Sequence, residues 1–135
     1  MAQSCQMTFM FDMTEDQLQY QIVTYLDVSL PNNCVYHHSP NEGKRHINYI
    51  NRLKKLGTKY GWPDLEICVP KEHTTSGHAQ TFYIELKTKR GSMNANQKLR
   101  RDELLNAGQH WALCRSVDDV QAFLKPLIKL RVVDE

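Results

Sequence analysis

The sequence predicts an α/β fold in which a mixed β-sheet is flanked by helices. Segments with helical spacing of apolar residues and segments with strand alternation follow one another in the order α-β-α-β-β-α-β-α. The chain has 135 residues, of which 41% are hydrophobic and 24% charged, as is usual for a globular protein with its own core. We therefore expect a single domain over residues 1–135.

The first half of the chain carries two helix signals and one strand signal. Residues 1–12 show no periodic pattern and are expected to form a flexible arm or a short edge strand. Thr14 and Gln17 have the spacing of a capping box and open a helix over residues 14–29, which Pro31 ends. A short strand is expected over 34–38. Residues 44–56 carry an apolar residue at every third position and predict a second helix that ends at Gly57.

The second half begins with a hairpin and ends with a helix. Leu65, Ile67 and Val69 alternate with other residues and indicate a strand; residues 71–80 read as a polar loop, and 81–87 as the returning strand. A helix over 94–107, a strand over 110–115 and a helix over 117–124 follow, with a tail over 125–135. Cysteines in the predicted strands (Cys34, Cys68, Cys114) are expected to be reduced and buried, as in a cytosolic protein.

Two short segments carry the residue types that metal chemistry needs. Asp64 follows Gly61-Trp62-Pro63 at the start of one strand, and Glu85 lies two residues before Lys87 in the next. Side chains two apart in a strand share a face, so Glu85 and Lys87 are expected together, with Asp64 beside them if the strands pair. Two carboxylates and a lysine can hold a hard divalent cation and activate a water. The alternatives are a polar strand cap for Asp64 and an ion pair between Glu85 and Lys87.

The basic residues flank these two segments. Residues 44–59 contain six Lys or Arg and no acid, and residues 87–101 contain six more, again without an acid. Such a distribution fits contacts to a phosphate backbone, and solvated helix faces are the alternative. The predicted nucleic-acid contacts are Lys44, Arg45, Lys59, Lys89, Arg90 and Lys98.

From about Thr14 to Leu124, the chain resembles the VRR-NUC domain, a branch of the PD-(D/E)xK nuclease superfamily. Five segments carry the resemblance, in the family's order: Glu15-x-x-Leu18-Gln19, His38-Ser39-Pro40-Asn41-Glu42-Gly43-Lys44-Arg45, Leu56-Gly57-x-x-x-Gly61-x-Pro63-Asp64-Leu65, Ile84-Glu85-Leu86-Lys87-Thr88-Lys89-x-Gly91 with Gln97-Lys98, and Arg115-Ser116-Val117-Asp118-Asp119. The roles of Asn41 and Glu42 in their segment stay open. The resemblance implies a restriction-endonuclease-like fold.

The resemblance also implies the site and its cofactor. Mg²⁺ or Mn²⁺ would be held by Asp64, Glu85 and the backbone carbonyl of Leu86, with Lys87 orienting or deprotonating the attacking water. Gln97 is implied in the site, although its spacing from Asn94 also fits a capping box. Glu15, and more weakly Gln19, would approach the metal, although an acidic residue in a first helical turn also interacts favourably with the helix dipole.

The partners follow from the same resemblance. Its stand-alone members, of phage or bacterial origin, look like homodimeric Holliday-junction resolvases, so the expected partners are branched or flapped DNA and a second copy of the chain. A flap or nicking nuclease and a catalytically silent DNA-binding module remain alternatives. A cytoplasmic location without membrane association is expected, because the sequence shows no long apolar run and no secretion signal.

Overall fold

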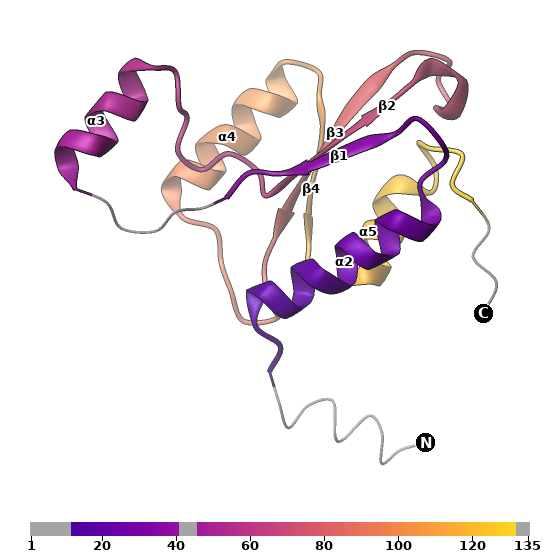
Figure 1. Cartoon of the computed structure of the whole chain (residues 1–135), viewed down its shortest axis with the longest axis horizontal. Coiled ribbons are helices and arrows are strands. Elements are labelled where there is room, and N and C mark those ends of the chain that lie inside the picture. The colour runs from indigo at the N-terminus through magenta and orange to yellow at the C-terminus, as the bar shows by residue number, and fades with distance from the viewer. Residues whose placement is uncertain (1–11, 41–45, 132–135) are drawn as a thin grey trace.

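The computed structural model describes residues 12–40 and 46–131, and its elements follow the predicted order (Figure 1). They are α2 (Glu15–Ser29), β1 (Val35–His38), α3 (Ile47–Lys55), β2 (Leu65–Val69), the short 3-10 helix η1 (Lys71–His73), β3 (Gln80–Leu86), α4 (Ala95–Asn106), β4 (His110–Cys114) and α5 (Val117–Leu124). The predicted boundaries agree with these to within about three residues. Residues 1–11 of the predicted arm lie outside the described residues.

The four strands form one mixed sheet in the order β1-β2-β3-β4. β1, β2 and β3 pair in antiparallel fashion, and β4 pairs with β3 in parallel, which requires the crossover that α4 supplies. In the β2–β3 register Leu65 lies opposite Ile84. The same register, continued by one residue, brings Asp64 opposite Glu85.

The hydrophobic core lies on one face of the sheet. Alternate residues of β2 and β3, among them Ile67, Phe82 and Ile84, are fully buried there. α2 and α5 supply the other half of this core and therefore cover the same face. α4 contacts β4 instead, and its one buried residue, Leu104, lies outside the main core cluster.

The first helix starts as its sequence predicts. The Gln17 N–H donates to Thr14 Oγ1 at 3.1 Å, and the Thr14 N–H donates to Gln17 Oε1 at 2.9 Å. This reciprocal pair satisfies two backbone N–H groups that a helix start otherwise leaves without partners. Leu18, Ile22 and Leu26 then face the core at helical spacing.

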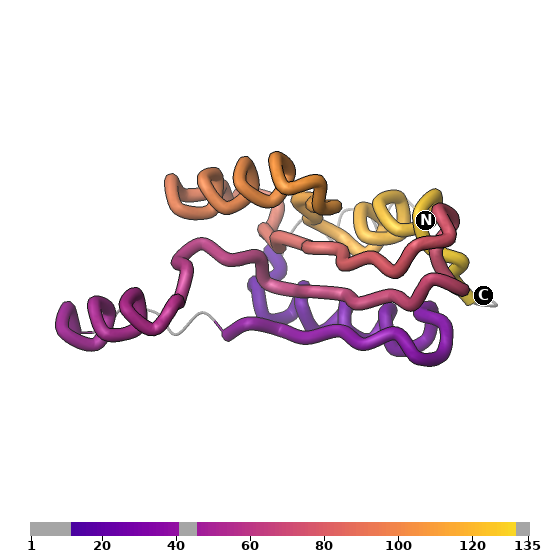
Figure 2. Tube along the Cα trace, turned by 90° about the horizontal axis from the view of Figure 1, so that it is seen from above, coloured from indigo at the N-terminus to yellow at the C-terminus, as the bar shows by residue number. Residues whose placement is uncertain are grey.

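α3 begins later than predicted and does not pack into the core. His46 caps the helix, with its Nδ1 accepting from the Asn48 N–H at 3.1 Å, so the first helical residue is Ile47 rather than Lys44. No residue of α3 is buried; Ile47 is 59% exposed, and Leu56, just after the helix, is 70% exposed. Figures 1 and 2 both show α3 beyond one end of the sheet.

The loop after β2 and the chain after α5 are more ordered than predicted, because they bind each other. Thr74 is buried and forms a β-bridge with Ile128, which itself joins the core. Beyond it, the Arg131 N–H donates to the Ser29 carbonyl at 2.7 Å. Residues 125–131 are therefore part of the domain rather than a tail.

The prediction for the cysteines is partly wrong. Cys114 is buried, Cys34 is half-buried, and Cys68 is exposed. Cys68 alternates with Ile67 and Val69, which face the core, so its side chain points to the opposite face of the sheet. The three cysteines are free, as predicted.

Candidate active site

Asp64 is fixed at the start of β2 by contacts to both neighbouring strands. The Leu86 N–H donates to Asp64 Oδ2 at 2.7 Å. On the other side, the Ser39 N–H and His38 Nδ1 both donate to the Asp64 carbonyl oxygen, at 3.0 and 2.9 Å. One carboxylate oxygen is thus tied to β3 and the backbone to the end of β1, so the orientation of Asp64 is set before any ligand binds.

Glu85 is an acidic residue whose side chain is almost completely buried. It is 1% exposed, and apart from Asp64 its oxygens have no hydrogen-bond partner among the described residues. Burial raises the pKa of Glu85 to about 9; a hydrogen bond to Asp64 and the charge of Asp64 add to this rise, and Lys87 opposes it. Without a cation beside it, the buried carboxyl group is therefore favoured in its neutral form.

Lys87 follows the end of β3, and its backbone extends the sheet by one hydrogen bond. The Lys87 N–H donates to the Cys114 carbonyl at 3.2 Å, and the side chain is half-buried. The turn that follows Lys87 is held by Arg115, which comes directly after β4. Arg115 Nη1 donates to the carbonyls of Thr88 at 2.6 Å and Gly91 at 2.8 Å. This role of Arg115 cannot be predicted from the sequence, because the contact joins residues far apart in the chain.

The start of α4 packs directly against the segment that leads into Asp64. Gly61 has a positive φ of 81°, and a Cβ placed there would collide with the backbone of Asn96 and lie 2.6 Å from the Gln97 nitrogen. Only glycine allows this approach. Gln97 completes a capping box, in which the Asn94 N–H donates to Gln97 Oε1 and the Gln97 N–H to Asn94 Oδ1, both at 2.9 Å.

A cavity of about 450 Å³ joins Asp64 to the start of α4. Its walls come from the end of β1, from α3, from the segment before Asp64 and from α4; the lining residues are Ser39, Pro40, Tyr49, Leu53, Thr58, Lys59, Tyr60, Gly61, Trp62, Asp64, Asn94, Asn96 and Gln97. The structure therefore brings Gln97 into the cavity of Asp64 and also gives it a capping role. The two readings of Gln97 are compatible, since capping uses only its Oε1 and its N–H.

Glu15 does not join the carboxylate pair in this structure. It is exposed in the first turn of α2, and Gln19 is half-buried one turn later. Among the described residues no group of three or more His, Cys, Asp or Glu side chains lies close enough to hold a metal ion. The carboxylate pair of Asp64 and Glu85 thus lacks a third protein carboxylate here.

The predicted DNA contacts that belong to the described residues lie at the same end of the sheet as Asp64. Lys59 lines the cavity, while Lys89, Arg90 and Lys98 are exposed near the Lys87 turn and the start of α4. Arg90 forms an exposed ion pair with Asp12 at 3.3 Å. Lys44 and Arg45, together with Asn41 and Glu42, lie outside the described residues.

Trp62 and Glu66 support one wall of the cavity through a contact that the sequence does not predict, although Glu66 is expected on the same face of the strand as Asp64. Trp62 Nε1 donates to Glu66 Oε1, and the Trp62 ring contacts Tyr83 edge-on at 5.7 Å between centroids. Glu66 therefore holds an aromatic wall of the cavity. Its position two residues after Asp64 was the only available signal for a role near the site.

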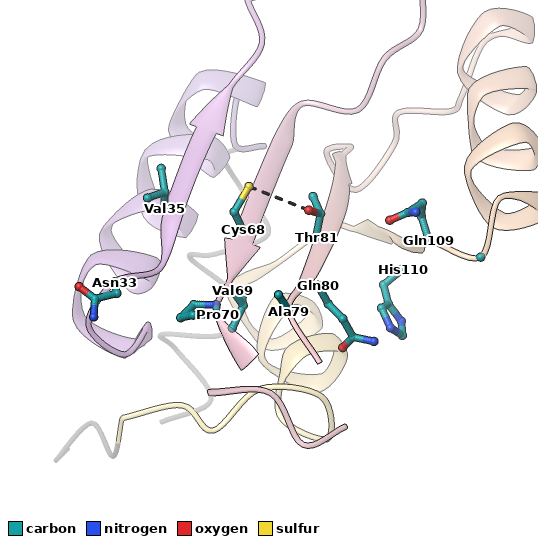
Figure 3. A pocket seen from close by; sticks show the side chains of 11 residues that line it. Asn33, Val35, Cys68, Val69, Pro70, Ala79, Gln80, Thr81, Gln109 and His110 are labelled. Carbon is teal, nitrogen blue, oxygen red and sulfur yellow. Dashed lines mark hydrogen bonds between the residues drawn. The ribbon is translucent and has the colours of Figure 1, made fainter. Parts of the chain in front are cut away.

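A second cavity lies at the opposite end of the sheet and lacks the chemistry of the first. It measures about 580 Å³ and is lined by these residues (Figure 3): Asn33, Val35, Cys68, Val69, Pro70, Ala79, Gln80, Thr81, Gly108, Gln109 and His110. Thr81 Oγ1 lies 4.0 Å from Cys68 Sγ. The described residues of this lining include no Asp, Glu or Lys, so they do not provide the donor set found beside Asp64.

The residues at the Asp64 end fit a hard divalent cation. Glu85 has two buried oxygens that apart from Asp64 have no partner among the described residues, and Oδ2 of Asp64 accepts from the Leu86 N–H. Mg²⁺ takes oxygen ligands, keeps several waters and is commonly held by one or two protein carboxylates. Two carboxylates and a backbone carbonyl are therefore a sufficient donor set.

Comparison with known proteins identifies the fold. No family model and no curated protein sequence matches the chain. A solved structure described as a VRR_NUC domain protein is similar to it, with a TM-score of 0.65 and 21% sequence identity over 88% of this chain and 91% of that chain. No helix of the described residues is long and apolar enough to cross a membrane. The architecture is the mixed-sheet, restriction-endonuclease-like α/β fold of VRR-NUC proteins, as the sequence predicts.

Proposed function

We propose that this chain is a metal-dependent, structure-selective DNA endonuclease that hydrolyses phosphodiester bonds. One observation carries the proposal: the buried carboxyl group of Glu85 lies across the strand pair from Asp64 and next to Lys87. A carboxylate pair with an adjacent lysine is the donor set for a divalent cation that works on phosphate. The fold it shares with a VRR_NUC domain protein supports this reading.

Asp64, Glu85 and the Leu86 carbonyl would hold Mg²⁺ or Mn²⁺. When bound, the metal supplies Lewis-acid polarisation of a phosphoryl oxygen and lowers the pKa of a water ligand. Glu85 must lose its proton to bind a metal, which couples metal affinity to pH.

The remaining residues act on water and on charge. Lys87 orients the attacking water, helps to deprotonate it and offsets the negative charge that builds up on the pentavalent phosphate. Gln97 contributes the NH₂ group that its capping box leaves unused, as a donor to the water or to a phosphate oxygen. Arg115 fixes the turn after Lys87 and so limits the positions that the lysine can take.

The DNA contacts and the assembly complete the proposal. Exposed Lys59, Lys89, Arg90 and Lys98 surround the site and suit the phosphates of branched or flapped DNA. We propose a homodimer, because two sites can then cut two strands of a four-way junction. The exposed apolar side of α3, including Ile47 and Leu56, is a surface for this contact.

The finer alternatives differ in substrate and in chemistry. A flap or nicking nuclease would use the same residues on one strand only and needs no second copy. A catalytically silent DNA-binding module would keep the basic surface, but Asp64, Glu85 and Lys87 are all present and close together, which favours the enzyme. A cytoplasmic location accords with the free cysteines.

The test is cleavage of end-labelled four-way junction, flap, linear duplex and single-stranded DNA, each with Mg²⁺, Mn²⁺ or EDTA. Glu85→Gln keeps the shape of the side chain but cannot ionise to bind a metal, and Glu72→Gln is the matched control because Glu72 is exposed on η1 at the other end of the sheet. Sedimentation of the free protein measures its oligomeric state.

Paired symmetric cuts on the junction, lost with EDTA and in Glu85→Gln but kept in Glu72→Gln, are the expected result. Cuts confined to flaps or single strands would retain the chemistry and overturn junction resolution. Binding without cleavage under any metal would overturn the enzyme and leave the DNA-binding module.

A further inference from the structure

The cavity beside Asp64 has a lining whose chemistry goes beyond metal binding. Three aromatic residues (Tyr49, Tyr60, Trp62) and three carboxamide residues (Asn94, Asn96, Gln97) contribute to it. Among the described lining residues two are charged, Lys59 and Asp64, and they have opposite signs. Its volume of about 450 Å³ is that of a site for one small ligand.

We propose that this cavity binds the base of an unpaired nucleotide that adjoins the phosphate being cut. The inference rests on the proposed function and names the feature of DNA that the enzyme selects. Aromatic rings stack on the faces of bases, and carboxamides bind base edges. A sugar-phosphate backbone would require more cations than the described residues of this lining offer, and a purely apolar ligand would leave the carboxamides without partners.

The walls of the cavity are fixed by contacts outside it. Arg100 Nε of α4 donates to the Tyr60 carbonyl at 2.9 Å, and Lys54 Nζ of α3 lies 5.6 Å from the centre of the Tyr60 ring. Trp62 is held by Glu66 and Tyr83, and Gly61 packs on the start of α4. A site formed before binding loses little conformational entropy when a base enters.

Polar groups of the lining are available to a base edge. The capping box uses Oδ1 of Asn94 and Oε1 of Gln97, so their two NH₂ groups remain as donors. The hydroxyl of Tyr60 is buried and has no hydrogen-bond partner among the described residues, so a base can meet it only after a shift of the ring. Such groups favour the binding of a ligand that carries hydrogen-bonding atoms along one edge.

The location of the cavity ties base binding to cleavage. Asp64 lines the cavity and is also a proposed metal ligand, so a base in the cavity belongs to a nucleotide next to the reacting phosphate. A base within continuous duplex is stacked on both faces and paired along its edge, and it must be extruded to enter. Flaps, gaps and junction centres present such a base at lower cost, which explains structure selectivity without reading sequence.

The experiment compares flap substrates that differ by one base. An abasic nucleotide, which keeps the sugar and phosphate, replaces the normal one on either side of the cut in turn. Cleavage is measured as kcat/KM, and binding is measured separately by fluorescence anisotropy with Ca²⁺ in place of Mg²⁺. The proteins are the wild type, Tyr60→Ala, Tyr60→Phe, Asn96→Ala and the matched control Tyr20→Ala, whose tyrosine is 75% exposed on α2.

Removal of the base at one position is expected to reduce both kcat/KM and affinity about tenfold in the wild type and in Tyr20→Ala. In Tyr60→Ala the starting affinity is already lower, and base removal should have little further effect, because the two changes delete the same contact. Asn96→Ala, at an exposed position, and Tyr60→Phe are expected to show smaller versions of this non-additivity and keep the test valid if Tyr60→Ala is unstable.

Abasic substrates cut and bound as well as normal ones by the wild type would overturn the inference. Losses that simply multiply in Tyr60→Ala and Asn96→Ala would overturn it as well. Failure of the proposed function looks different: no DNA is cut with any metal, while the anisotropy measurement still reports whether the base contributes to binding.

Discussion

Replacing Glu85 by Gln is expected to stabilise the metal-free protein while it abolishes metal binding. Glu85 is fully buried, and the pKa of its carboxyl is raised from about 4.5 to about 9 by burial and by Asp64. At pH 7 the side chain is therefore mostly protonated in the folded protein and ionised in the unfolded chain. Glu85 must therefore bind a proton on folding, at a pH above the pKa that it has in the unfolded chain. This requirement reduces the free energy of unfolding.

The direction and size follow from linkage. The stabilising contribution of a group with a raised pKa is fully present below its unfolded pKa, near 4.5, and is lost as pH rises through about 9. Each pH unit between the two pKa values lowers the free energy of unfolding by about 1.4 kcal/mol. The loss at pH 7 is therefore at most about 3 kcal/mol. Gln does not titrate, so Glu85→Gln should gain about 1–3 kcal/mol there, or roughly 4–10 °C in Tm for a chain of this size.

Thermal unfolding in EDTA at pH 5, 7 and 9 measures this difference. The wild type and Glu85→Gln should have similar Tm values at pH 5, and the gap should widen toward pH 9. Excess Mg²⁺ should then stabilise the wild type, by about 2.7 kcal/mol at a hundred times its Kd, and leave the variant unchanged. Equal Tm values at all three pH values would refute the idea that Glu85 is a buried, uncompensated acid.

Three further outcomes are expected. Lys87→Ala should lower the cleavage rate by about 10²–10⁴-fold with Mg²⁺ binding retained in calorimetry, whereas Lys129→Ala, at an exposed position far from the site, should have no effect; lost metal binding would contradict the role given to Lys87. Gly61→Ala should lower the free energy of unfolding, measured in urea, by about 2–5 kcal/mol, and Gly77→Ala should lower it by only about 1–2 kcal/mol. Both glycines have φ near +80°, but a Cβ at Gly77 meets no atom within 4 Å. Equal losses in the two variants would show that α4 does not pack as described. Arg115→Ala should reduce kcat with KM nearly unchanged, since the Thr88 and Gly91 carbonyls lose their donor and the turn after Lys87 loosens; a change confined to KM would indicate a direct DNA contact instead.

The facing of the two carboxylates could be predicted from the sequence because strand alternation is a local property. Phe82, Ile84 and Leu86 had to face the core, which placed Glu85 on the other side, and the hairpin brought Asp64 opposite it. Capping boxes at Thr14 and Asn94 were predictable for the same reason, since both partners lie within one turn.

Contacts between distant segments could not be predicted in this way. The apolar spacing of α3 correctly indicated a helix, but spacing does not tell what the apolar side contacts, and in this structure no residue of α3 is buried. The approach of Gly61 to α4, the clamp of Arg115 and the support of Trp62 by Glu66 each depend on how elements pack. Glycine in the segment before Asp64 was a visible signal, although the sequence did not show which element it would meet.

The bridge between Thr74 and Ile128 affects when the site can form during synthesis. Every residue proposed for catalysis precedes Lys98, yet Ile128 is part of the core beneath β2 and β3, and Arg131 is tied to the end of α2. A nascent chain that ends before these residues contains both carboxylates but lacks part of the core that holds their strands together. Hydrolytic capacity should therefore appear only after the residues up to Arg131 have left the ribosome.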